Sequence, residues 1–124
     1  MSDWTAGYVA DIGYTYRYYK ELNPLRMRLA LLNAGIEPPK FNQNNQNTCA
    51  CELGFGQGLS AAIHAAASDT QWFGNDFLPS QAAFAQSLAA AAGTEAEFTD
   101  ESFAEFLARD DLPKFDFICL HGVW

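Results

Sequence analysis

The sequence predicts an α/β domain in which helices flank a parallel β-sheet. Three observations lead to this prediction: strand-like and helix-like segments alternate from residue 48 onward, glycines cluster after the first strand, and acidic residues follow the second and third. Alternation favours parallel pairing because parallel neighbours need a long crossover connection, which is nearly always right-handed.

The composition indicates a globular protein with one core. The chain has 124 residues, of which 49% are hydrophobic and 18% charged, unlike a disordered protein. A formal net charge of −8 disfavours nucleic acids and anionic membranes as partners. The three cysteines lack the spacing of a disulfide framework or a metal site, so no metal is predicted. The chain has neither a signal-like start nor an apolar segment of membrane length, which predicts a cytoplasmic protein.

Residues 1–47 are predicted to form an N-terminal helical cap and a polar connector. The tyrosine-rich segment Tyr8–Glu21 is expected to be partly helical, and residues 38–47 a loop. A better signal lies between them, because Asn23 can cap a helix, Pro24 suits its first position and Gly35 can end it. This helix would carry an apolar stripe of Leu25, Leu29 and Leu32. The basic residues nearby are interpreted as a solvated helix face, with a local anion site as the alternative: Arg17, Lys20, Arg26 and Arg28.

Residues 48–124 are predicted to form the main unit. Ser102 and Glu105 have the spacing of a capping box, which predicts a short helix through Ala108. The other expected helices are Leu59–Ala67 and Pro79–Ala92, and the expected strands are Thr48–Leu53, Gln71–Asp76, Ala96–Thr99 and Phe115–Leu120.

The segment Glu52–Gly58, with the sequence Glu-Leu-Gly-Phe-Gly-Gln-Gly, joins the first strand to its helix. Glycines at this junction permit positive φ angles and let a ligand approach the backbone, where a helix start offers unpaired N–H groups. The second strand ends at Asp76 and the third at Asp100 and Glu101. Carboxylates at this edge of the sheet can accept hydrogen bonds from a nucleoside, so the pattern predicts a nucleoside pocket.

Glu52–Gly58 resembles the first motif of class I S-adenosylmethionine-dependent methyltransferases, Glu/Asp-x-Gly-x-Gly-x-Gly. The resemblance runs from about Thr48 to the last residue. It implies a Rossmann-like sheet of strand order 3-2-1-4 with helices on both faces, S-adenosylmethionine as cofactor and S-adenosylhomocysteine as product. Because the family's sheet has seven strands, the chain resembles its N-terminal, cofactor-binding half.

The same resemblance implies a role for each matching residue. The three glycines would shape the turn beneath the amino-acid part of the cofactor, with Glu52 below it, while Asp76 would hold the ribose and Asp100 the adenine amino group. Phe55 and Phe77 are the aromatic residues considered for cofactor contact; the others are expected in the core. The cofactor contacts so predicted are Glu52, Gly54, Phe55, Gly56, Gly58, Asp76, Phe77, Asp100 and Glu101.

The predicted reaction is in-line transfer of the sulfonium methyl group to an N, O, C or S atom of an unknown acceptor. His121, at the end of the fourth strand, is a candidate base, with a structural role as the alternative. No catalytic residue is otherwise identified.

Two alternatives to this function are considered. A dinucleotide enzyme would need Gly-x-Gly-x-x-Gly, and its pyrophosphate would be repelled by Glu52. A non-catalytic nucleoside-binding or assembly module would keep the fold without an acceptor site. Because the later strands of the methyltransferase sheet are absent, the exposed edge of the fourth strand is expected to pair with a second copy or a complementing segment.

Overall fold

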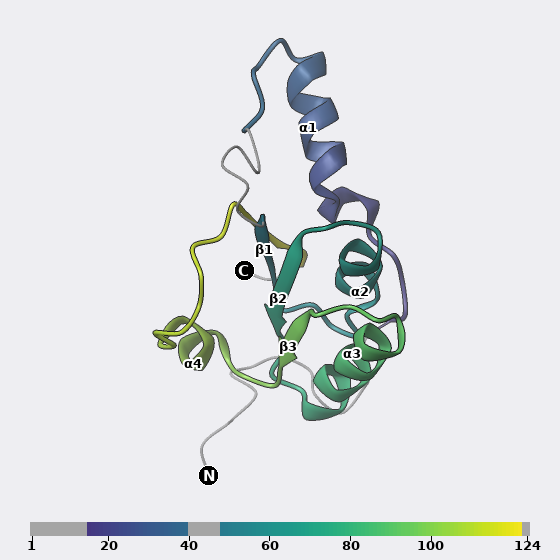
Figure 1. Cartoon of the computed structure of the whole chain (residues 1–124), viewed down its shortest axis with the longest axis vertical. Coiled ribbons are helices and arrows are strands. Elements are labelled where there is room, and N and C mark those ends of the chain that lie inside the picture. The colour runs from purple at the N-terminus through teal and green to yellow at the C-terminus, as the bar shows by residue number, and fades with distance from the viewer. Residues whose placement is uncertain (1–14, 40–47, 123–124) are drawn as a thin grey trace.

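The computed structural model describes residues 15–39 and 48–122 (Figure 1). The start of the tyrosine-rich segment, including Tyr14, and most of the polar connector lie outside the described residues. In the remainder, four parallel strands form one sheet of order β3-β2-β1-β4, which confirms the predicted order. The strands are β1 (Cys49–Leu53), β2 (Gln71–Asn75), β3 (Glu97–Thr99) and β4 (Phe117–Leu120).

Helices cover both faces of the sheet, as predicted. Figure 1 shows α2 (Leu59–Ala66) and α3 (Pro79–Ala91) on one face and α4 (Phe103–Leu107) on the other. Alternate residues of β1 serve the two cores: Ala50 packs under α2 and α3, and Cys51 belongs to the second core with Phe73 and Phe106.

The fourth strand begins two residues later than the sequence suggested. Asp116 precedes β4, and its backbone N–H and carboxylate both bond Cys49, with N to Cys49 O at 2.8 Å and Cys49 N to Oδ2 at 2.9 Å. Phe115 lies against Phe73 with ring centroids 5.5 Å apart. Phe115, which was predicted to lie in the strand, therefore precedes it and packs against Phe73.

Helix α1 (Pro24–Asn33) follows a short 3-10 helix, η1 (Lys20–Leu22), and has the predicted termini. The Asn23 side chain accepts a hydrogen bond from Leu25 N at 2.9 Å, with Pro24 in the first turn. At the other end Gly35 has φ 75°, and Ile36 N bonds Leu31 O at 2.9 Å, which completes a Schellman motif.

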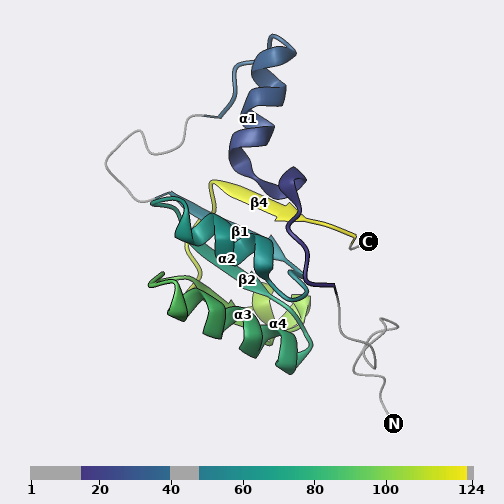
Figure 2. The ribbon, with the colours of Figure 1, turned by 90° about the vertical axis from the view of Figure 1, so that its right-hand side faces the viewer.

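The apolar stripe of α1 does not pack on the domain. No residue of α1 is buried, and Figure 2 shows the helix standing beyond the β4 edge of the sheet, away from α2 and α3. Leu22, in the turn before it, is buried in the core that contains Ala50. The helix is therefore attached at its start and leaves its leucines exposed.

Candidate functional site

The loop Gly54–Gly58 joins β1 to α2 at the carboxyl end of the sheet, beside the ends of β2 and β4. Its three glycines have φ angles of 62°, 62° and 74°, a region that glycine enters without the steric strain of other residues. The prediction that these glycines adopt positive φ angles is therefore confirmed.

Residues at the end of β2 hold the loop in place. Gly54 N donates to Asn75 Oδ1 at 3.2 Å, Phe55 N donates to Asn75 O at 3.1 Å, and Gly56 N donates to Asp76 Oδ2 at 2.9 Å. Three successive backbone donors thus bond to the neighbouring strand end, so the loop is a braced element.

Asp76, predicted as the ribose ligand, has a structural role here. Besides Gly56, its carboxylate accepts hydrogen bonds from Leu78 N at 3.0 Å and from Gln81 Nε2 at 2.9 Å. The residue is buried, and burial raises the pKa of its carboxyl above the usual range, against the opposing effect of these hydrogen bonds. A carboxylate has about four acceptor positions, so Asp76 keeps capacity for one further donor.

Glu52, two residues before the glycine loop, is a buried acid with an unsatisfied carboxyl oxygen. Its side chain is 2% exposed, and Oε1 has no hydrogen-bond partner in the described part of the chain. Burial raises the pKa of this carboxyl to about 8, because an ion removed from water without a counter-ion is unfavourable. Such a group is neutral near pH 7 and would ionise if a cation came beside it.

Two predicted contacts, Gly58 and Phe55, turn out to serve packing. A Cβ at Gly58 would lie 2.4 Å from the Ala85 Cβ, so this glycine lets α2 and α3 approach each other. The Phe55 side chain is buried, lies 5.1 Å from the Phe98 ring and fills the space above Gly74. The ring of Phe55, which was considered for cofactor contact, is buried in the core, and its contact with a cofactor stays a prediction.

The two acids after β3 differ in their surroundings. Oε1 of Glu101 accepts from Thr99 Oγ1 at 2.6 Å and from Arg109 Nη1 at 3.1 Å, and the Glu101 carbonyl accepts from Asn75 Nδ2 at 2.9 Å. Asp100 is exposed and has no hydrogen bond to another described residue. Glu101 therefore anchors the loop after β3, whereas Asp100 keeps an exposed carboxylate. Phe77, next to Asp76, is half-buried.

The segment before η1 contacts helix α2 and the residue that follows β4. Tyr19 N donates to Ser60 Oγ at 2.7 Å, and the Tyr19 ring stacks on His121 with centroids 4.2 Å apart. Tyr18 Oη hydrogen-bonds His64 Nε2 at 3.0 Å. His121, the candidate base, is thus placed at the carboxyl end of the sheet but against an aromatic ring.

Three residues of this region were not identified as site residues from the sequence: Asn75, Gln81 and Tyr19. Asn75 is 1% exposed and links the glycine loop to the loop after β3. Its only signal was a polar residue at the end of an otherwise apolar strand.

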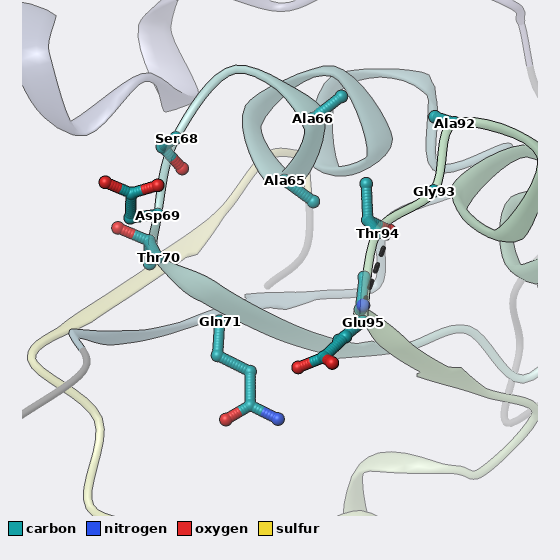
Figure 3. Close-up of a pocket in the computed structure, with 11 residues that line it drawn as sticks. Ala65, Ala66, Ser68, Asp69, Thr70, Gln71, Ala92, Gly93, Thr94 and Glu95 are labelled. Carbon is teal, nitrogen blue, oxygen red and sulfur yellow. Dashed lines mark hydrogen bonds between the residues drawn. The ribbon is translucent and has the colours of Figure 1, made fainter.

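A cavity of about 280 Å³ lies at the opposite, amino edge of the sheet, between the ends of α2 and α3 (Figure 3). Asp69 and Glu95 project from two sides of it and are exposed. We do not assign it to a nucleoside, because ligands of open α/β sheets bind at the carboxyl ends of the strands.

No group of three or more His, Cys, Asp or Glu side chains is arranged to hold a metal ion within residues 15–39 and 48–122. None of the helices described is long and apolar enough to span a membrane.

Comparison with known proteins finds a relative in sequence and matches among solved structures. No protein-family model matches the chain. It is 42% identical over 123 residues to the uncharacterized protein sll1526 of Synechocystis sp. (strain ATCC 27184 / PCC 6803 / Kazusa), an alignment that covers 98% of this chain and 24% of that protein. The chain therefore spans about a quarter of the length of this relative.

The solved structure of PKMT2 from Rickettsia typhi in complex with AdoHcy superposes with a TM-score of 0.69 and 22% identity. The match covers 89% of this chain and 20% of that one. Together with the strand order and the glycine loop, it shows that the chain has the fold of a class I S-adenosylmethionine-dependent methyltransferase.

Proposed function

We propose that the chain binds S-adenosylmethionine at the carboxyl end of its sheet and is the cofactor-binding part of a methyltransferase. One observation carries the proposal: Glu52, two residues before the glycine loop, is buried with an unpartnered Oε1. A buried carboxyl oxygen without a partner is unfavourable by itself, and a ligand ammonium group beside it would supply a hydrogen-bond donor and a positive charge that lets Glu52 ionise. S-adenosylhomocysteine (AdoHcy) carries the same ammonium group.

The other residues of this edge fit the remaining parts of the cofactor. Gly54 and Gly56 would shape the surface under its amino-acid part, the free acceptor position of Asp76 would face a ribose hydroxyl, and Asp100 would face the adenine amino group. Phe77 would lie beside the nucleoside. The division into a cap of residues 1–47 and a half domain of residues 48–124 belongs to the same proposal, as does a cytoplasmic location.

The cofactor, when bound, supplies a methyl group on a sulfonium, and the protein has to align it with an acceptor atom. His121 lies at the correct edge for a base, but its ring is stacked on Tyr19.

Titration calorimetry with AdoHcy tests the proposal. We expect binding by the wild-type chain, and at least tenfold weaker binding by Glu52→Gln, which keeps the shape and removes the charge. The matched control is Glu95→Gln, a carboxylate at the amino-edge cavity, which should bind like wild type. Absence of binding to the folded wild-type protein, or equal binding by Glu52→Gln, would contradict the proposal.

A non-catalytic nucleoside-binding module is the second candidate function. It rests on the same geometry, which would hold a nucleoside whether or not methyl transfer follows. AdoHcy binding without methyl transfer to any supplied acceptor would favour it over the enzyme.

We also propose that the free edge of β4 pairs with a complementing segment or a second copy. Within the described residues β4 pairs only with β1, and Ile118 and Leu120 are 57% and 42% exposed. Exposed edges with apolar side chains tend to recruit another strand. A monomer by light scattering that is fully active in methyl transfer would contradict this proposal.

A further inference from the structure

Helix α1 exposes a leucine seam that the domain does not use. Leu25, Leu29 and Leu32 follow the spacing i, i+4, i+7, which places them on one face of the helix, and they are 72%, 68% and 55% exposed. Met27 and Leu31, on the other side, are half-buried. The face of α1 that contacts the protein is therefore not the face that carries this seam.

Arginines border the seam. If Leu25 and Leu29 are placed at heptad positions d and a, Arg26 and Arg28 fall at e and g, the positions whose charges select a partner in helix pairs. Neither arginine forms an ion pair with another described residue. Helix α1 itself contains no acidic residue, so the border of the seam within the helix is basic, and Glu21 of η1 is near enough to Arg26 to interact with it electrostatically.

From this arrangement we propose that α1 docks an amphipathic helix of a separate partner polypeptide, one with an apolar seam bordered by glutamate or aspartate. Leucines on both helices would bury the seam, and the partner's acids would pair with Arg26 and Arg28. The proposal is independent of cofactor binding, since α1 contributes nothing to the glycine loop.

Two other occupants are less compatible with the charges. A second copy of α1 packed symmetrically would place arginine against arginine, and like charges at e and g disfavour pairing. An anionic membrane would attract the two arginines but repel the rest of a chain whose net charge is −8. A helix with an acidic rim would bury the leucines and pair with both arginines.

The test uses a labelled synthetic heptad peptide with leucine at a and d and glutamate at e and g, titrated with the full chain and followed by fluorescence anisotropy. We expect saturable binding, and at least tenfold weaker binding of the same peptide with lysine at e and g. Leu29→Gln should abolish binding, while Leu107→Gln, which changes a leucine of α4 that is 71% exposed, should not.

A charge exchange sharpens the test. Reversing both arginines (Arg26→Glu with Arg28→Glu) should transfer the preference to the lysine-rimmed peptide, and circular dichroism should show that each variant stays folded. Failure to bind the glutamate peptide, or equal binding by Leu29→Gln, overturns the proposal. Self-association that Leu29→Gln removes, or binding to anionic phospholipid vesicles without binding to the peptide, overturns it in favour of those occupants.

Discussion

Gly58 and Gly35 have similar backbone conformations at helix ends, but Gly58 is tightly packed and Gly35 is open to solvent. Each is next to a helix end and has a left-handed φ, 74° and 75° respectively. A Cβ at Gly58 would collide with Ala85, whereas a Cβ at Gly35 would meet nothing within 4 Å. The braced site around Gly58 and the projecting α1 ended by Gly35 therefore show that the same local signal serves a packed region and a solvent-exposed one.

The largest effect is expected when this pair is substituted by alanine. Gly58→Ala adds both left-handed strain and overpacking against α3, which together should destabilise the protein by roughly 2–5 kcal/mol. Gly35→Ala adds only the strain, about 1–2 kcal/mol. Chemical denaturation measures both, and equal losses would show that the α2–α3 contact can adjust.

A smaller effect should follow the removal of the Asp76 carboxylate. Asp76→Ala leaves Gly56 N and Leu78 N without their acceptors, and each unsatisfied buried donor is unfavourable, so we expect a loss of roughly 1–3 kcal/mol in unfolding free energy.

Asp100→Ala is the matched variant at the same edge. Because Asp100 is exposed, its removal should leave stability unchanged and weaken AdoHcy binding. If Asp76→Ala were as stable as wild type and lost only affinity, Asp76 would be a ligand without the bracing role.

The pH dependence of stability should identify Glu52. Unfolded glutamate ionises near pH 4.5, whereas the folded group ionises near 8. The unfolded state therefore loses its proton first, and stability should fall as the pH rises from about 4.5 to about 8, by at most about 1.4 kcal/mol per pH unit.

Glu52→Gln should remove this slope. Comparison of the two proteins is needed because His64 acts in the opposite direction: burial lowers its pKa, so its contribution is lost as the pH falls below about 6.5. If the unfolding free energies of wild type and variant changed with pH at the same slope, the pKa of Glu52 would be near its ordinary value.

The smallest effect is expected on α1. Leu29→Gln should change the free energy of unfolding by no more than about 0.5 kcal/mol, because the side chain is 68% exposed and leaves no cavity. A loss of several kcal/mol would show that the leucine seam is covered within the chain itself, and thermal unfolding distinguishes the two outcomes.

Much of the fold was predictable because its signals are local. The Asn23 cap, the capping box of Ser102 and Glu105, and the alternation of strands and helices each depend on neighbouring residues, and the structure contains all of them. The glycine loop was also located correctly, since positive φ angles favour glycine whatever surrounds them.

What side chains do within that fold depends on residues that are far apart in sequence. The sequence by itself determined where Asp76, Phe55 and the α1 leucines lie along their elements. Only the tertiary structure placed the Asp76 carboxylate against Gly56, buried the Phe55 ring against Phe98 and left Leu29 exposed. The physical reason is that hydrogen bonding and burial are set by neighbours in space, which a pattern of residue types along the chain does not specify.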